Sequence, residues 1–415
     1  MIRLFDKHNS RRCLMALCLL ICTAVCAVAQ QAVRDFVRES GIPSGSLAVL
    51  VVDVATGDTI AAHNVSAPLI PASIMKSVTT AALLQHTGPD YEYHTRVYTE
   101  GDIDSNGILH GNVVTVASGD PSLNSRVEPV GTDIIAEIAE ALMEAGVKSI
   151  EGRLIVDDSV WSGPSIPSGW ARPDLARDYG TGIHSLNFEN NTKGSSSVSD
   201  PTAVYLGRLR GALEVRGINV QGKTVDGGTR NEILDHVSPP IDEIMRSLMM
   251  RSDNMMAEAM LRTYSKETGG DGSTTDGASR GMSLWKRRGL PMGGVRIEDG
   301  SGLSRSNRLT ADFMGSVLRD MSHDVYYASF FPLAGQEGTL RKFLCNTELD
   351  SYIAMKTGSM TGIQCFAGYK LDEEYAPTHI VVIMANDIQG GNGRMKKAAA
   401  KMLLRLFGCN VPSEQ

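Results

Sequence analysis

The sequence predicts an α+β fold in which an antiparallel sheet is flanked by helices and a second domain is inserted. Runs of apolar and β-branched residues predict five strands near the two ends of the chain, at residues 46–54, 59–63, 351–355, 364–370 and 378–385. The first two flank Ala55-Thr56-Gly57-Asp58, which is typical of a hairpin turn. We therefore expect both ends of the chain to pair in one sheet.

Helix-like runs accompany these strands. They lie at residues 33–40, 74–85, 241–250, 255–264 and 394–407. The last of them places Met402 and Leu403 opposite Lys397 and Lys401, so it predicts an amphipathic helix that covers the sheet.

The middle of the chain does not fit this pattern. The stretch from residue 74 to residue 251 is too long for a connection within one domain. Strand-like segments at 112–117 and 153–157 alternate there with a helix-like one at 132–146, and the run 194–197 predicts a flexible loop. We assign residues 91–240 to an inserted domain, and residues 30–90 and 241–415 to the principal domain.

Residues 1–29 have the pattern of a secretory signal peptide. Four basic residues precede the apolar run 13–28, and Ala27-Val28-Ala29 forms a small-residue cleavage site. The alternative is an uncleaved membrane anchor, but the apolar run is short for a membrane span. We expect export across the cytoplasmic membrane into a periplasm.

Composition limits the remaining choices. The chain has 415 residues and a net charge of −7. This mild acidity argues against a nucleic-acid partner, and the sequence contains no basic cluster that would indicate one. After removal of the signal peptide, Cys345, Cys365 and Cys409 remain, which allows at most one disulfide. Their spacing indicates no metal site, and we expect neither a metal nor a cofactor.

The first of three chemical motifs is Ser73-Ile74-Met75-Lys76, at the start of a predicted helix. Residues three apart share a helix face, so the Lys76 amine can reach the Ser73 hydroxyl. Serine needs an adjacent base to act as a nucleophile, and lysine is a base only when its pKa is lowered. The alternative is a serine helix cap with a solvated lysine. The same spacing recurs at Ser283 and Lys286, but that lysine precedes two arginines at a basic helix end, so we reject it.

The second motif is Ser252-Asp253-Asn254, a polar break between two apolar helices. Ser252 is placed to relay a proton from Lys76 to a leaving amine, and Asn254 to bind substrate amides. The alternative is an Asx-type cap of the following helix, and both can hold together.

The third motif is Lys356-Thr357-Gly358, followed by Ser359, on a predicted strand. Alternate residues of a strand face the same way, so Lys356 and Gly358 share a face that Thr357 does not. Gly358 lets a peptide approach the strand, and Lys356 with the hydroxyl of Thr357 or Ser359 binds a carboxylate if a local twist brings Thr357 round. The N–H groups of Ser73 and Ser359 are the expected oxyanion hole. The alternative is a surface lysine beside a turn.

In this order the three motifs are typical of penicillin-binding proteins and β-lactamases. The sequence resembles the class C low-molecular-mass penicillin-binding proteins of the penicillin-binding protein 4 type, which are serine D-alanyl-D-alanine carboxypeptidase/endopeptidases. Further matching blocks are Gly119-Asp120-Pro121-Ser122-Leu123, Gly152-Arg153-Leu154-Ile155-Val156-Asp157-Asp158-Ser159, Gly169-Trp170, Asp299-Gly300-Ser301-Gly302-Leu303-Ser304-Arg305 and Pro332-Leu333-Ala334-Gly335.

The resemblance implies a penicillin-binding/β-lactamase-like transpeptidase fold. It implies that peptidoglycan stem peptides acylate Ser73, with Lys76 as base and Ser252 as relay, and that β-lactam antibiotics bind covalently at Ser73. Asn254, Lys356 and Thr357 become substrate contacts.

Arg305 and Asp174 are further candidates for binding a stem peptide, the first through its bidentate fork and the second as a partner for a cationic group. A structural salt bridge is the alternative for Arg305.

Two other functions stay open at this point, a β-lactamase and a non-catalytic peptidoglycan-binding protein. Peripheral membrane association and a homodimer are also left open.

Overall fold

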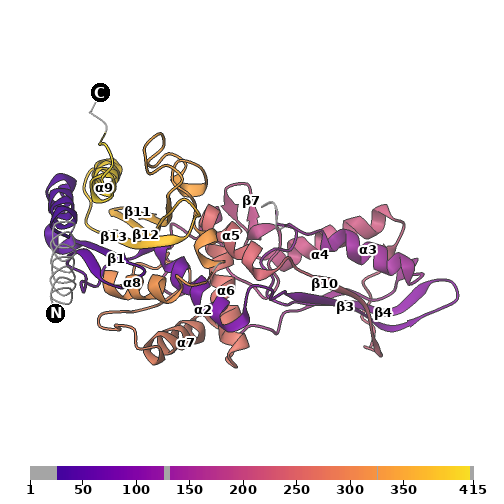
Figure 1. The fold of residues 1–415 in the computed structure, drawn as a ribbon. Coiled ribbons are helices and arrows are strands. Elements are labelled where there is room, and N and C mark those ends of the chain that lie inside the picture. The colour runs from indigo at the N-terminus through magenta and orange to yellow at the C-terminus, as the bar shows by residue number, and fades with distance from the viewer. Residues whose placement is uncertain (1–25, 126–130, 325, 412–415) are drawn as a thin grey trace, which may run out of the picture. The chain divides into compact units, whose positions relative to one another are not determined.

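The computed structural model describes residues 26–125, 131–324 and 326–411 (Figure 1). Most of the predicted signal peptide, residues 1–25, lies outside this part of the chain. The chain divides into two compact units. The first comprises Met1–Ile74, Leu290–Val295 and Arg308–Gln415, and the second comprises Met75–Gly289 and Arg296–Asn307.

The first unit contains a five-stranded sheet made from both ends of the chain, as the sequence predicts. Its strand order is β11-β12-β13-β1-β2, and every neighbouring pair is antiparallel. The strands are β1 (Leu47–Asp53), β2 (Thr59–His63), β11 (Ile353–Met360), β12 (Ile363–Leu371) and β13 (Pro377–Ala385). This order makes β11, which carries Lys356-Thr357-Gly358, an edge strand of the sheet.

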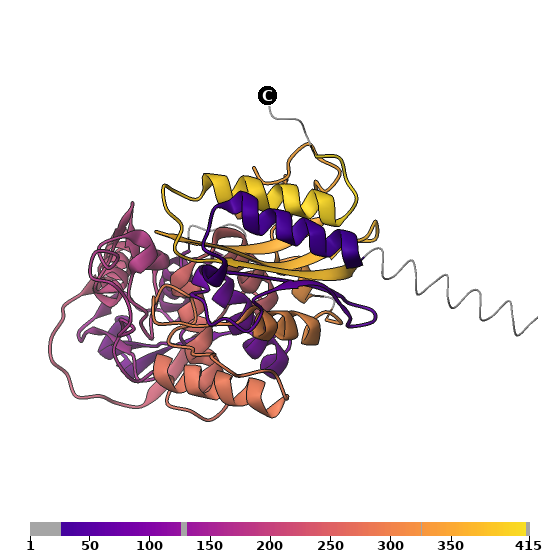
Figure 2. The same cartoon turned by 90° about the vertical axis from the view of Figure 1, so that its left-hand side faces the viewer.

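Helices cover both faces of this sheet. A helix over residues 26–40 lies beside α9 (Gly393–Leu406) on one face, and α8 (Ala311–Asp320) lies on the other (Figure 2). The apolar residues of α9 pack into the core with those of the sheet, while Lys396 and Lys397 are exposed. The predicted amphipathic helix is therefore confirmed, and burial of its apolar stripe holds it on the sheet.

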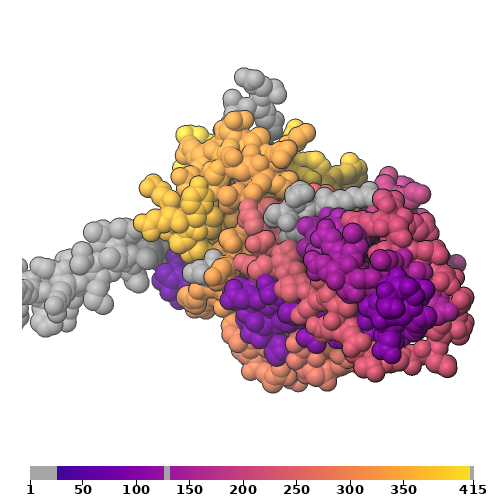
Figure 3. All heavy atoms as spheres, turned by 90° about the vertical axis from the view of Figure 1, so that its right-hand side faces the viewer, coloured from indigo at the N-terminus to yellow at the C-terminus, as the bar shows by residue number. Residues whose placement is uncertain are grey.

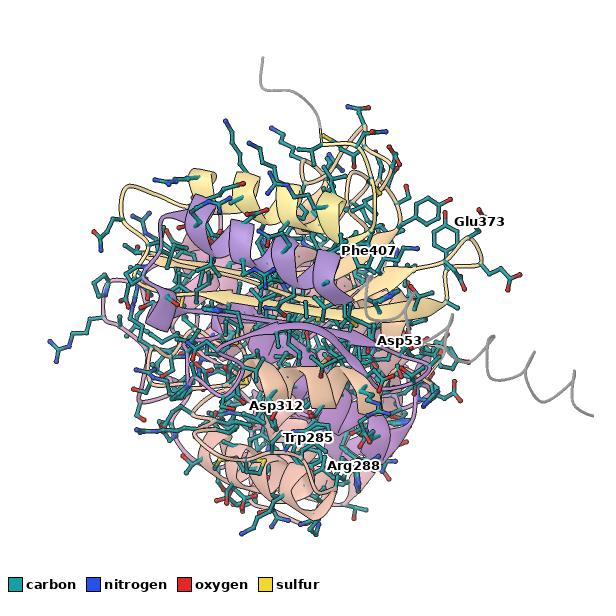
Figure 4. The ribbon with its side chains drawn as sticks, turned by 60° about the vertical axis from the view of Figure 1, so that its left-hand side comes forward. Asp53, Trp285, Arg288, Asp312, Glu373 and Phe407 are labelled. Atoms are coloured by element: carbon teal, nitrogen blue, oxygen red, sulfur yellow. The ribbon has the colours of Figure 1, made fainter. Side chains whose placement is uncertain are left out.

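The turn between β12 and β13 and the end of α9 lie at the periphery of the first unit. Glu373 lies at the tip of the turn between β12 and β13, and Phe407 follows α9 (Figure 4). The Phe407 ring meets the ring of His379 from β13 edge-on, with centroids 5.2 Å apart. Within the described residues no disulfide forms, and the thiols of Cys345, Cys365 and Cys409 are free.

The second unit contains a six-stranded sheet that lies wholly within the predicted inserted domain. Its order is β10-β3-β4-β5-β9, with β6 also paired to β4. The strands are β3 (His94–Ile103), β4 (Ile108–Val116), β5 (Ser149–Ile150), β6 (Leu154–Asp157), β9 (Asn219–Val220) and β10 (Arg230–Val237). Figure 3 shows the surfaces of these segments, purple and pink, side by side although they are far apart in the sequence. Helices α3 (Ile134–Glu144) and α4 (Pro201–Val215) share a core with this sheet.

The helical part of the second unit carries the second motif and Lys76 of the first. Helix α6 (Asn254–Glu267) packs against α2 (Met75–Thr87), α5 (Ile241–Arg251) and α7 (Thr274–Arg287). Residues 254–265 of α6 are all buried, as are residues 75–84 of α2. Polar side chains on these two helices are therefore shielded from water, which is the condition for shifting their pKa values.

Some local predictions were wrong. The run 194–197, predicted as a flexible loop, belongs to a small hairpin of β7 (Thr192–Lys193) and β8 (Ser196–Ser197), where Gly194 supplies the positive φ of the turn. Strand β11 also continues through the Lys-Thr-Gly motif to Met360 instead of ending there.

No helix within the described ranges is long and apolar enough to cross a membrane.

Candidate active site

Ser73 lies in a tight turn that leads directly into α2. The turn is the 3-10 helix Ala72–Ile74, and α2 begins at the next residue, Met75, so Ser73 lies in the turn that leads into the helix. Ala72 has a φ of 47° and is buried, as is Ile74. An alanine in the left-handed region is strained, and such strain persists where the surroundings hold the backbone firmly. The backbone around Ser73 is therefore held in one conformation.

Strand β11 approaches this turn closely through Gly358. A Cβ atom on Gly358 would lie 2.6 Å from the carbonyl oxygen of Pro71 and 2.9 Å from the amide nitrogen of Ser73. Only glycine fits at these distances. The structure thus places the third motif directly against the Ser73 backbone.

The polar side chains of β11 face in different directions, as the alternation predicts. The Lys356 side chain is fully buried, and its Nζ donates to the carbonyl oxygen of Thr357 at 3.0 Å. The Thr357 hydroxyl donates to Thr339 Oγ1 at 2.8 Å, and Ser359 Oγ accepts from Asn392 Nδ2 at 3.0 Å. Thr339 and Asn392 were not recognised in the sequence because their neighbours in space are distant in the chain.

Lys76 has the environment that a general base needs. Its side chain has no exposed surface, and its Nζ donates to Asn254 Oδ1 at 2.6 Å and to the Ser301 carbonyl at 2.7 Å. Burial lowers the pKa of Lys76 to about 8, although the charges of Asp299, Asp253 and Glu258 oppose the shift. About a tenth of this amine is therefore neutral at pH 7, far more than for a lysine with its ordinary pKa. The solvated-lysine alternative is excluded.

The second motif joins two helices with opposite caps. Ser252 ends α5 in the left-handed conformation, with φ 61° and ψ 39°, and its N–H donates to the Leu248 carbonyl. Asp253 begins α6, where its carboxylate accepts from the Met256 N–H at 2.9 Å. Asn254 donates from Nδ2 to the Tyr179 carbonyl at 2.8 Å and meets Lys76 through Oδ1. The cap predicted for this motif is therefore confirmed, and the roles of Ser252 and Asn254 in catalysis stay predictions.

A buried turn, residues 299–304, supports the lysine, and the sequence did not reveal this role. Glu258 Oε1 accepts from the N–H groups of Gly300 and Ser301 at 3.0 and 2.8 Å, which aims the Ser301 carbonyl at Lys76. Asp299 accepts from Trp170 Nε1 at 2.9 Å and also from Gly302 and Ser304. Burial raises the pKa of Glu258. A glutamate within the otherwise apolar run 255–261 was the available sequence signal.

Ser252 and Asn254 also line a cavity of about 340 Å³ within the second unit. Its other walls include Asp178, Tyr179 and Asn190. The second motif therefore lines a cavity of the size that small ligands occupy.

The two weaker candidates lie in the same unit. Asp174 accepts from the Tyr179 hydroxyl at 3.0 Å. Arg305 is exposed at the end of the turn that holds Lys76. Their binding roles remain predictions. Among the described residues, no group of three or more His, Cys, Asp or Glu side chains is placed to hold a metal ion.

The fold and site define a serine enzyme of the penicillin-binding/β-lactamase-like class. The chain matches the model of the D-Ala-D-Ala carboxypeptidase 3 (S13) family over residues 29–196 and 189–406, and it belongs to that family. This confirms the resemblance seen in the motifs.

Individual relatives agree with this assignment. The chain is 27% identical over 384 residues to carboxypeptidase DacB of Mycolicibacterium smegmatis, covering 87% of this chain and 80% of that protein. It is 24% identical over 408 residues to D-alanyl-D-alanine carboxypeptidase DacB of Haemophilus influenzae, covering 79% and 83%. The crystal structure of penicillin binding protein 4 from Haemophilus influenzae matches with a TM-score of 0.76 at 22% identity, over 91% of this chain and 98% of that one. At this identity the structural match establishes the fold.

Proposed function

We propose that this protein is a serine D-Ala-D-Ala carboxypeptidase and endopeptidase that hydrolyses peptidoglycan stem peptides through an acyl-enzyme on Ser73. One observation carries the proposal. Lys76, three residues after Ser73, is fully buried between two acceptors, and its pKa is lowered to about 8. A lysine in this state is a base, and a serine beside such a base is a nucleophile.

The reaction then follows from the roles of the three motifs. The neutral Lys76 amine takes the Ser73 hydroxyl proton as Oγ attacks the carbonyl of the penultimate D-alanine, and the N–H groups of Ser73 and Ser359 stabilise the oxyanion. Ser252 passes the proton to the leaving amine, whose departure breaks the C–N bond and leaves an ester on Ser73. Water then attacks the ester, which releases the shortened peptide and restores the serine.

The binding groups set the position of the peptide. The Asn254 amide contacts a substrate amide, while Lys356 and the hydroxyls beside it hold the carboxylate that follows the scissile bond. A β-lactam presents the same carboxylate and a reactive amide, so it acylates Ser73 in the same way. After export by residues 1–29, the enzyme acts on peptidoglycan in the periplasm.

Release of D-alanine from a pentapeptide ending in D-Ala-D-Ala tests the proposal. We expect release by the wild type and none above background by Ser73→Ala or Lys76→Met. Ser283→Ala is the matched control, because Ser283 has the same spacing to a lysine but its hydroxyl donates to the Ser279 carbonyl on the surface of α7. Activity that survives Ser73→Ala, or that is lost in Ser283→Ala, would overturn the assignment.

A further inference from the structure

A second segment of the first unit runs beside the edge strand β11. The Ala334 N–H donates to the Ile353 carbonyl at 2.8 Å, and the Met355 N–H donates to the Pro332 carbonyl at 3.1 Å. In the described part of the chain, the backbone hydrogen bonds between this segment and β11 end at Met355. The segment then turns into the 3-10 helix Gly338–Leu340, beside the part of β11 that carries Lys356-Thr357-Gly358.

This turn is firmly held. Leu340 at its end is fully buried in the core of the first unit. Gly335 has a φ of 76° and packs against the Asp350 carboxylate, which also accepts from Gln336 Nε2 at 2.7 Å and from the Asn346 N–H at 2.9 Å. These hydrogen bonds hold the pKa of Asp350 below its ordinary value. The position of the residue between these anchors, Thr339, is therefore determined by the fold.

The Thr339 hydroxyl completes a short chain of donors. The Thr357 hydroxyl donates its proton to Thr339 Oγ1 at 2.8 Å, so that proton points toward the turn. Thr339 is exposed, and within the described residues its own hydroxyl proton has no acceptor. A hydroxyl carries one proton, and a hydroxyl that accepts one hydrogen bond becomes a better donor in another. The hydroxyl of Thr339 is thus a donor available beside Thr357.

We propose that Thr339 is a substrate-binding residue whose hydroxyl donates to the carboxylate of the peptide and so selects substrates with a free carboxylate beyond the scissile bond. The inference rests on the proposed function and deepens it. The strand twist that was expected to turn the Thr357 side chain toward the carboxylate is not needed. Thr357 acts through Thr339, and Lys356 supplies the positive charge. Arg341 and Lys342, two exposed cations directly after the turn, favour an anion in this region.

The test compares two peptides that differ in one group, a pentapeptide ending in D-Ala-D-Ala and the same peptide with a C-terminal carboxamide. Loss of a hydrogen bond to a charged group lowers kcat/KM about 10-fold to 100-fold. We expect Thr339→Val to lower kcat/KM by this factor for the carboxylate peptide and by less than about 2-fold for the carboxamide peptide. Thr339→Ser keeps the hydroxyl and should restore the preference for the carboxylate.

Thr347→Val is the matched control. The Thr347 hydroxyl donates to the Leu344 carbonyl in the same connection, so its loss perturbs the segment without removing a donor from the proposed site. We expect Thr347→Val to leave the ratio of the two kcat/KM values unchanged. If Thr339→Val lowers kcat/KM equally for both peptides, or for neither, the inference is overturned. Activity of the wild type would still support the proposed function in that case. A wild type that hydrolyses neither peptide would overturn both.

Discussion

Replacement of the buried Lys76 should change how the stability of this protein depends on pH. In the unfolded chain the amine has its ordinary pKa of 10.5, and in the folded protein burial lowers the pKa to about 8. This difference corresponds to about 3 kcal/mol of free energy at a pH where both states are protonated. Lys76 therefore destabilises the fold near neutral pH, as a buried charge does.

The sign of the pH dependence follows from proton binding. Below about pH 8 both states hold the proton, and the cost of the buried charge is constant. Between about pH 8 and 10.5 the unfolded state binds the proton and the folded state does not, so the free energy of unfolding rises with pH. Above that range the amine is neutral in both states, and the cost has disappeared.

Lys76→Met removes this titration and keeps an apolar side chain of similar length. We expect the difference in unfolding free energy, wild type minus variant, to rise by about 3 kcal/mol between about pH 7 and pH 11. Urea unfolding at several pH values measures it, and taking the difference cancels the titrating groups that do not interact with Lys76. Burial raises the pKa of Asp253 and the charge of Lys76 lowers it, and this carboxyl titrates below the pH range of the measurement. A difference that stays constant, or that falls as pH rises, would refute the claim that Lys76 is a buried base of lowered pKa.

Substitutions at three positions, Asn254, Gly358 and Ser252, test the site further. In Asn254→Ala the Lys76 ammonium loses its acceptor at 2.6 Å, which lowers the pKa of the amine. The pH midpoint of acylation by benzylpenicillin should therefore fall by about 1–2 units. An unchanged midpoint would contradict the contact. Gly358→Ala places a Cβ 2.6 Å from a backbone oxygen and should lower both stability and acylation, whereas Gly393→Ala, with open space around it, should do neither. Ser252→Gly should be about 1 kcal/mol more stable than Ser252→Ala, because only glycine adopts φ 61° without strain. Both variants should slow acylation equally. Equal thermal stability of the two variants would argue against strain at this residue.

The sequence predicted the parts of this protein that depend on local pattern. Alternating and amphipathic runs located the five-stranded sheet and its terminal helix, because burial of one face imposes a fixed period. The motif residues were recognised for the same reason, since three-residue spacing on a helix and alternation on a strand are local properties. Lys356 and Gly358 lie two residues apart on the unbroken strand β11, and alternate residues of a strand share a face, as predicted.

The supporting contacts could not be predicted, because they join residues far apart in the chain. Glu258 meets the turn at Gly300 and Ser301, and Thr339 meets Thr357, through loops whose paths no local pattern specifies. The hairpin containing Gly194 was missed for a related reason. Serine and glycine are compatible with disorder by composition, and only pairing with a second strand orders them.

The most direct test of the central claim is the intact mass of the protein after incubation with benzylpenicillin, for the wild type and Ser73→Ala. We expect one stable penicilloyl group on the wild type and none on the variant. An unmodified wild type with surviving drug would contradict the claim that Ser73 is an activated nucleophile. An unmodified wild type that consumes the drug would instead identify a β-lactamase.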